Sequence, residues 1–272
     1  MNSRPAPRGH FELPSHSMEK PIIPQSLKDI RSEIDAVDRA MLELLERRFA
    51  AIRLIKAWKE QRGSEATSPI RPAREAEILR RLESFRNDVV PPDLMVRLWR
   101  CMMAAATAVQ AQVTIHMSEE IERDGQLRDL VREHFAGLAL REHGSIDDMV
   151  RASAAKPADI AVVRPQSDWI TPLLRQKQLR VIGLLPFLSK RREAPKLLML
   201  GQVKAEPTGE DQTLLALDPG RAAPQGTLWS AAAGDYRCLA VEGFLDETSG
   251  ILKGAGQAAI LGQCPSPLEI PR

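Results

Sequence analysis

Apolar residues recur at helical spacing from Ser26 to about Gly63, and this pattern predicts one long amphipathic helix of about ten turns. Ser26 is a residue type that caps helix N-termini, and Gly63 is one that ends helices. The same stretch keeps many cations, which a helix with so many apolar residues does not need for its folding. The apolar positions are Leu27, Ile30, Ile34, Val37, Met41, Leu44, Leu45, Phe49, Ile52, Ile55 and Trp58.

Two shorter helices follow. Pro72 stands at a predicted first helical position of residues 72–86, and Pro91-Pro92 ends the connection to a third helix, which we expect to run to about His116. One long, one short and one medium helix expose too wide an apolar surface for a small monomer to bury. The pattern therefore predicts an N-terminal all-α fold in which three helices per chain intertwine in a dimer.

Beyond residue 112 the pattern changes to alternating strands and helices, which predicts a C-terminal α/β (α+β) module. We expect helices at 124–138 and 145–155. Predicted strands lie at 113–117, 158–163, 179–188, 196–201, 211–218, 236–246 and 258–263. The predicted domains are a flexible Pro-rich tail at 1–25, a helical domain at 26–112, an α/β region at 113–205 and a strand-rich module at 206–272.

Composition and charge narrow the functional classes. Lys and Arg number 38 against 36 for Asp and Glu, so the overall charge does not indicate nucleic acid or an anionic membrane as a partner. The chain has no run of apolar residues as long as a membrane span or a signal peptide needs, and we expect a cytoplasmic protein. Cys101, Cys238 and Cys264 are too far apart for a zinc motif, and we expect ordinary thiols, no metal and no cofactor.

The spacing of three cations indicates that a dimer could bring them to one small molecule. Arg48 and Lys59 are eleven residues apart, so they project from one face of the helix, roughly 16 Å apart along its axis. Arg31 precedes Arg48 by seventeen residues, or about 25 Å, and cannot reach the same small molecule from the same helix. A partner's arginine can reach it in an intertwined dimer. The alternative is a solvated face whose long side chains cover apolar neighbours.

Four segments in order resemble the all-helical chorismate mutase family, the type found alone or fused ahead of prephenate dehydratase. The resemblance covers about residues 26–112. The segments are LKDIRSEIDAVDRAMLELLERR, IKAWK with its lysine eleven residues after Arg48, PIRPARE, and RLWRCMMAAATAVQ, which ends in a glutamine.

The resemblance implies a role for each matching residue. Arg31 of the partner subunit and Arg48 would bind the two carboxylates of chorismate. Lys59 would contact a carboxylate and the ether oxygen, and Gln110 would hydrogen-bond that same oxygen. Glu75 would bind the ring hydroxyl, and Arg74 would contribute mainly through its backbone. Without the family pattern, a solvent-exposed first-turn acid and a polar surface residue would be the simpler interpretations of Glu75 and Gln110.

The chemistry agrees with these roles. Rearrangement of chorismate to prephenate is unimolecular and needs no nucleophile, metal or redox cofactor. The enzyme has to hold a dianion in its compact conformer and stabilise negative charge on the ether oxygen as its bond breaks. Cations and an amide donor supply both.

Two departures from the family leave alternatives open. Arg71 stands where the family often has an aspartate beside the substrate hydroxyl, and Ala106, with Thr107 adjacent, stands where it often has a serine. The same fold hosts isochorismate pyruvate lyase, whose substrate differs chiefly in hydroxyl position. A further alternative is a non-catalytic helical regulator of an aromatic-pathway enzyme, against which the five matching side chains argue.

Three segments beyond residue 112 also match a family pattern: ADIAVVRP, EPTGEDQTLLAL and AAILGQCPSP. Through them, residues 113–272 resemble a reduced prephenate dehydratase region followed by a remnant of an ACT domain. The Thr-Arg-Phe motif of the dehydratase family is replaced by Pro195-Lys196-Leu197, and none of these can assist a leaving hydroxyl as the threonine does. We therefore expect no dehydratase activity. Gly226-Thr227-Leu228 stands where the family has a phenylalanine-binding Gly-Ala-Leu, but its companion motif is absent, so a structural or oligomeric role is favoured.

Overall fold

The computed structural model describes residues 26–62, 68–87, 89–189, 192–246, 248–250 and 258–269. The chain divides into two compact units, residues 1–48 and residues 49–272. The predicted tail at 1–25 lies outside the described residues.

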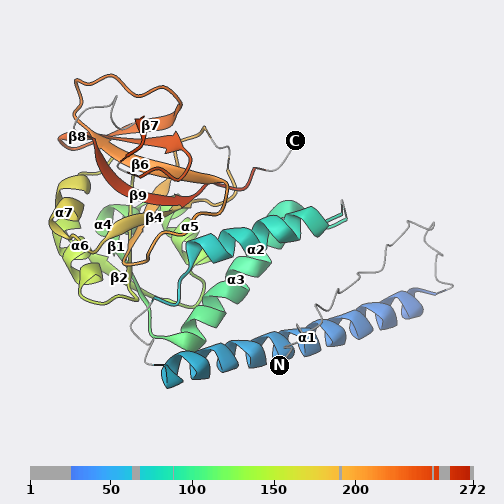
Figure 1. Cartoon of the computed structure of the whole chain (residues 1–272). Helices are drawn as coiled ribbons and strands as arrows, with labels where there is room; N and C mark the ends of the chain where they lie inside the picture. Colours follow the sequence, from blue (N-terminus) through green and yellow to red (C-terminus); the bar gives the residue numbers. More distant parts are fainter. Residues whose placement is uncertain are drawn as a thin grey trace, which may run out of the picture. The chain divides into compact units, whose positions relative to one another are not determined.

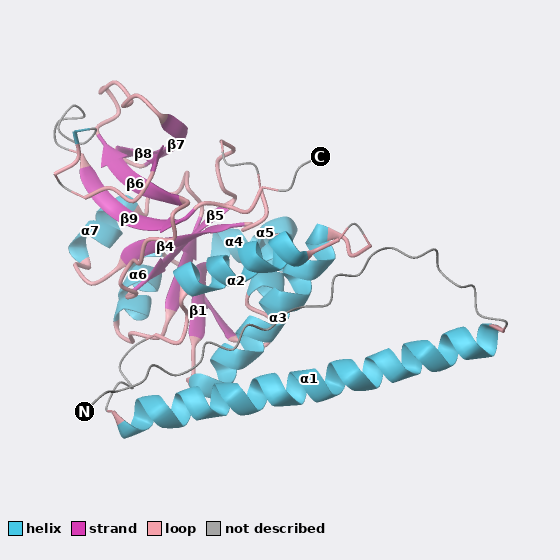
Figure 2. Ribbon diagram, turned by 45° about the vertical axis from the view of Figure 1, so that its right-hand side comes forward, coloured by secondary structure: helices cyan, strands magenta, loops and turns pink. Residues whose placement is uncertain are grey.

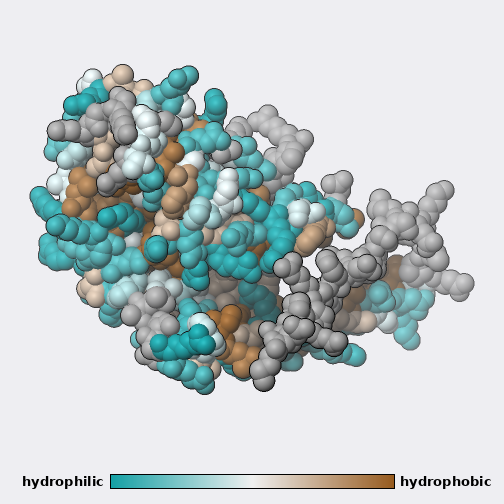
Figure 3. Space-filling model, viewed as in Figure 1, coloured by the Kyte–Doolittle hydropathy of each residue, from teal (hydrophilic) through white to brown (hydrophobic). Residues whose placement is uncertain are grey.

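The long helix predicted from the sequence is confirmed as α1, Leu27–Gln61, which runs without a break (Figure 2). Ser26 caps it, because its hydroxyl accepts a hydrogen bond from the Asp29 N–H at 3.2 Å and donates one to the Asp29 carboxylate at 2.7 Å. Large apolar side chains of α1 are exposed, among them Leu27, Leu44 and Leu54 at 62%, 63% and 71%. Brown, hydrophobic surface is visible over α1 in Figure 3.

The two shorter helices are α2, Pro72–Phe85, and α3, Pro92–Gln110, each with a proline in its first turn as predicted. The predicted end of the third helix near His116 is wrong. Ala111 has extended backbone angles, φ −156° and ψ 161°, and residues 114–118 form a strand that pairs on both sides. A cluster of Ala76, Leu79, Met95, Val96, Met103, Phe187 and Leu268 joins α2 and α3 to two residues from the C-terminal half.

The first sheet has the strand order β2-β1-β3-β5-β4. Its strands β1, β2 and β4 are labelled in Figure 1. Its strands β1, β2 and β3 are parallel, and β5 is antiparallel to both β3 and β4. The bounds are β1 Thr114–Ser118, β2 Ala139–His143, β3 Ile160–Val163, β4 Arg180–Leu185 and β5 Leu197–Gly201. Four helices accompany this sheet, α4 Glu119–Arg123, α5 Gly125–His134, α6 Ile146–Ala154 and α7 Ile170–Arg175.

The second sheet is antiparallel and has the order β7-β8-β6-β9. Its strands are β6 Asp211–Leu217, β7 Thr227–Ala233, β8 Tyr236–Glu242 and β9 Ala259–Pro265. The α/β character predicted for residues beyond 112 is thus confirmed. The exact domain boundaries at 112 and 205 stay a prediction.

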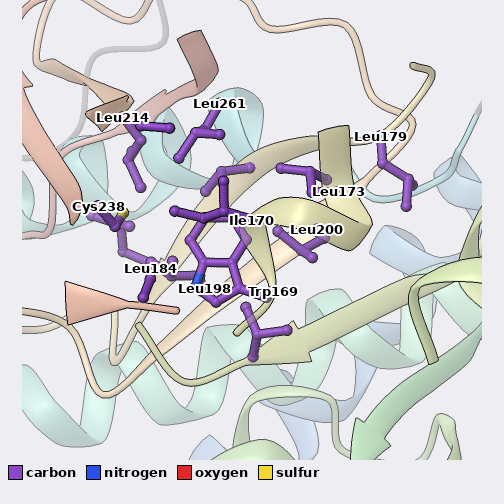
Figure 4. Close-up of a cluster of buried hydrophobic side chains, with 14 of the residues drawn as sticks. Trp169, Ile170, Leu173, Leu179, Leu184, Leu198, Leu200, Leu214, Cys238 and Leu261 are labelled. Atoms are coloured by element: carbon purple, nitrogen blue, oxygen red, sulfur yellow. The ribbon is translucent and has the colours of Figure 1, made fainter. Parts of the chain in front are cut away.

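One hydrophobic cluster joins the two sheets. Trp169 is fully buried at the start of α7, and side chains from α7, β4, β5, β6, β8 and β9 surround it in Figure 4. Strands β4 and β9 approach so closely that a Cβ on Gly262 would lie 2.1 Å from the Val181 carbonyl oxygen. Only glycine allows this approach. The second sheet therefore shares a hydrophobic core with the first sheet within the unit of residues 49–272.

Candidate active site

Two of the predicted site residues come together from helix ends that are distant in sequence. Lys59 lies in the last turn of α1 and Gln110 is the last residue of α3. The Lys59 Nζ donates to the Gln110 Oε1 at 3.4 Å, and the Gln110 Nε2 donates to the Ala106 carbonyl oxygen at 3.3 Å. An ammonium group and an amide, both able to donate hydrogen bonds, are thus neighbours.

The ionisation of Lys59 is shifted by its surroundings. Partial burial lowers the pKa of the Lys59 ammonium, and the positive charge of Arg71 lowers it further. On the same helix, Lys56 and Glu60 pair with one another at 4.0 Å. Arg71 therefore belongs to the electrostatic environment of the site, although the sequence indicated only that it replaces an aspartate.

Glu75 is present in the first turn of α2, and its carboxylate is not left facing solvent. It forms an ion pair with the Arg100 Nη1, and the side chains of Glu75 and Arg100 are only 16% and 8% exposed. The Arg100 guanidinium also lies over the Phe187 ring, with its Cζ 5.0 Å from the ring centroid. Its buried Nε has no hydrogen-bond partner among the described residues.

Arg100 was missed by the sequence analysis. Its signal was its position: of the two arginines in α3, it is the one on the same helical face as Met103 and Thr107. Such an arginine is buried at a cost unless a carboxylate neutralises it, and Glu75 does so. Burial lowers the pKa of the Arg100 guanidinium, and the charge of Glu75 and their hydrogen bond raise it.

A small cavity adjoins this ion pair. His134, at the end of α5, brings a third titratable group to the cavity wall. Burial, followed by the positive charge of Arg100, lowers the pKa of His134 well below its ordinary value of 6.5. The polar lining of the cavity is Glu75, Arg100, Thr107 and His134.

Three further residues, Arg74, Arg31 and Arg48, were predicted for the site. The Arg74 side chain is exposed and pairs with Glu77 at 3.0 Å, so its side chain is directed to its own helix. Arg31 and Arg48 lie on α1 within residues 1–48, and burial lowers the pKa of the Arg48 guanidinium. Arg71 forms two hydrogen bonds of 2.6 Å to the Glu206 carboxylate.

The C-terminal motif positions have structural roles. The Lys196 N–H donates to the Leu185 carbonyl oxygen at 2.9 Å, and Leu197 is fully buried in β5. Gly226 has a φ of 85°, the left-handed region that glycine adopts without strain. The Thr227 hydroxyl donates to the Pro224 carbonyl oxygen at 2.7 Å, within the same turn.

The cysteines are all free thiols. Cys101 is exposed, whereas Cys238 and Cys264 are buried. Burial raises the pKa of both buried thiols, which keeps them protonated. Within the described ranges, no group of three or more His, Cys, Asp or Glu residues is arranged to hold a metal ion.

Comparisons with known proteins bear on residues 30–111, which match the family model described as chorismate mutase type II. No curated protein gives a match. None of the helices in the described part of the chain is both long enough and apolar enough to cross a membrane. The cytoplasmic location stays a prediction.

Two solved structures are similar over the larger part of the chain. One is described as GqqA, a novel type of quorum quenching acylases, with 14% identity and a TM-score of 0.36, covering 56% of this chain and 95% of its own. The other is a prephenate dehydratase from Streptococcus mutans, with 13% identity and a TM-score of 0.35, covering 59% and 100%. Likeness of this degree decides nothing about the activity of this chain.

The lowered pKa of His134 predicts an acid-sensitive fold. Between its folded pKa and the unfolded value of about 6.5, only the unfolded chain takes up the proton, so stability falls as the pH falls. From pH 7.5 to 5.5 this group should cost about 1 kcal/mol of unfolding free energy. Urea unfolding at the two pH values measures it.

The variant His134→Gln should lack this part of the pH dependence. His143→Gln is the matched comparison, because the pKa of His143 is also lowered but less strongly, and it should flatten the profile less. An unchanged profile in His134→Gln would show that His134 titrates normally.

Proposed function

On the premise that residues 30–111 are a chorismate mutase type II domain, we propose that the chain rearranges chorismate to prephenate in sites that two copies build together. The observation that carries the proposal is the contact between Lys59 and Gln110. These are the two residues expected to act on the ether oxygen, and they are 51 positions apart in sequence, on α1 and α3.

The reaction makes a specific demand on these two groups. As the ether bond breaks, negative charge grows on the oxygen, and donors already in place stabilise it without reorganising. The Lys59 ammonium and the Gln110 amide would converge on that oxygen. The Gln110 Oε1 accepts from Lys59, and a bound substrate would take over one hydrogen bond of that ammonium.

Arg31 and Arg48 require the second copy. They are about 25 Å apart along an uninterrupted helix, which is longer than chorismate. Arg31 is exposed and would bind a carboxylate in the site of the partner. Arginine suits this role because its planar guanidinium pairs with a carboxylate through two hydrogen bonds.

The exposed apolar face of α1 supports a helix-to-helix contact between copies. From Leu27 to Leu44 its residues alternate at spacings of three and four, the pattern of a helical seam. A seam of this length is unusual on the surface of a monomer. The exposed members are Leu27, Ile30, Ile34, Val37, Met41, Leu44, Ile55 and Trp58.

The second candidate remains isochorismate pyruvate lyase. The observation in its favour is that Glu75, the residue expected to bind the ring hydroxyl, is engaged by Arg100, while Arg71 replaces the neighbouring aspartate. The two substrates differ chiefly in the position of that hydroxyl. The mutase is favoured because the groups assigned to the ether oxygen are in contact.

We propose no dehydratase activity for the C-terminal half. In place of the family's Arg and Phe, Lys196 bonds the Leu185 carbonyl oxygen through its backbone N–H just before β5, and Leu197 is buried in that strand. Pro195 has no hydroxyl in place of the threonine. This proposal concerns catalysis alone.

The purified full chain should consume chorismate and accumulate prephenate, with no phenylpyruvate, and the activity should survive a chelator. Absorbance of chorismate and chromatography of products measure this, with isochorismate as the comparison substrate. Faster release of pyruvate from isochorismate would favour the lyase. Appearance of phenylpyruvate at an enzymatic rate would refute the proposal for the C-terminal half.

Shared sites predict complementation between two inactive variants. Arg31→Ala and Lys59→Ala should each lose activity by about 10²-fold or more, as removal of an oxyanion donor does. After subunit exchange, about half of the dimers are mixed, and each keeps one intact site of two. Activity should then recover to roughly a quarter of the wild-type value if the sites are independent.

Mass spectrometry of differently tagged chains should verify the exchange. Mixing Lys59→Ala with Lys59→Ala carrying a different tag is the matched control, because no intact site can form in that mixture. Absence of recovery after verified exchange would mean that one chain supplies all cations of a site.

A further inference from the structure

Helix α2 is attached to the C-terminal half through two arginines. The Arg80 guanidinium donates to the Thr208 hydroxyl at 2.8 Å and to the carbonyl oxygens of Glu210 and Ser266 at 2.8 and 2.9 Å. At the start of the helix, Arg71 donates to both carboxylate oxygens of Glu206. Both arginines thus reach the segment that precedes β6.

That segment is held in a fixed form. The buried carboxylate of Asp211 accepts from the N–H groups of Thr208 and Gly209 at 2.8 and 3.1 Å and from the Thr208 hydroxyl at 2.7 Å. An acceptor of three hydrogen bonds orders the chain around it. Glu206 therefore extends from a supported segment toward Arg71.

Arg71 connects this segment to Glu75. It is the residue immediately before α2, and its carbonyl oxygen accepts from the Glu75 N–H at 3.0 Å. No side-chain cap bonds the start of this helix, so the placement of Arg71 fixes where the first turn begins. The first turn carries Arg74 and Glu75, both predicted site residues.

Arg71 also acts on the site by charge. Its cation lies close enough to Lys59 to contribute to the lowering of the Lys59 pKa. A bidentate carboxylate partner directs the guanidinium and partly neutralises it. Glu206 therefore influences both the position of Glu75 and the field at Lys59.

We infer that Glu206 is a positioning residue for the mutase site and acts through Arg71. The C-terminal half of the chain then helps to build a site in the N-terminal helical region. This inference rests on the proposed function. It gives residues 206–211 a role that does not depend on any dehydratase chemistry.

The test is a double-mutant cycle in the full chain with Arg71→Gln, Glu206→Gln and the double variant. Each single variant should lower kcat/KM for chorismate about fivefold, because small displacements of positioned groups reduce rates. The kcat/KM of the double variant should be no lower than that of the worse single variant, because both substitutions remove the same Arg71–Glu206 ion pair. Asp147→Asn, which breaks the exposed Arg175 pair of 3.3 Å, is the matched control and should keep its activity.

The pH dependence separates positioning from a merely structural role. The alkaline limb of kcat/KM, which follows Lys59, should move to lower pH in Glu206→Gln, because Arg71 loses its counter-charge. It should move to higher pH in Arg71→Gln. Loss of stability alone moves neither limb.

The outcomes are distinguishable. Three results would each overturn the inference and leave the mutase proposal standing. They are a Glu206→Gln variant as active as the wild type, additive losses in the double-mutant cycle, and an alkaline limb of the pH profile that stays in place in both single variants. A wild-type chain without mutase activity would overturn the proposed function itself.

Discussion

A rigid helix keeps its cations at fixed distances from one another, and this constraint determines how the proposed site can be assembled. A small dianion needs several positive groups within a few ångströms, whereas Arg31 and Arg48 are about 25 Å apart on α1. The helix cannot bend to bring them together without losing its hydrogen bonds. In the proposed dimer, pairing with a second copy would bring a partner's cation to each site and would also cover the exposed apolar seam. A site assembled in this way ties catalysis to association, because a separated chain would lack a cation.

Local signals predicted much of the helical region. The apolar spacing and Ser26 gave α1 its extent, and Pro72 marked the start of α2. The end of α3 was misjudged, because the apolar residues after Gln110 suit a buried strand as well as a helix. β2 was missed since its ALREH sequence has no apolar run and lies at a sheet edge. Its identity depends on pairing with β1, which no local pattern records.

The residues assigned to the site stay a prediction. Lys59, Glu75 and Gln110 were selected through the family pattern, and the structure places Lys59 and Gln110 in contact. The ion pairs of Glu75 with Arg100 and of Arg71 with Glu206 join positions 25 and 135 residues apart. Neither distance is set by helix periodicity. Both ion pairs are tertiary features: the first joins α2 to α3, and the second joins the start of α2 to the segment before β6.

The proposed shared site requires antiparallel pairing of two α1 helices, because parallel pairing would place each Arg31 beside the partner's Arg31 and far from its Arg48. Thiol cross-linking tests this pairing most directly. If Arg31 faces the middle of the interval between Arg48 and Lys59, the two-fold axis lies near Met41. In a Cys101→Ser background, Met41→Cys should cross-link between copies with a short bismaleimide. Ala51→Cys, on the same seam, should not, because the two thiols would be about 27 Å apart. Efficient cross-linking of both variants would indicate parallel helices and contradict the shared site, as would cross-linking of neither.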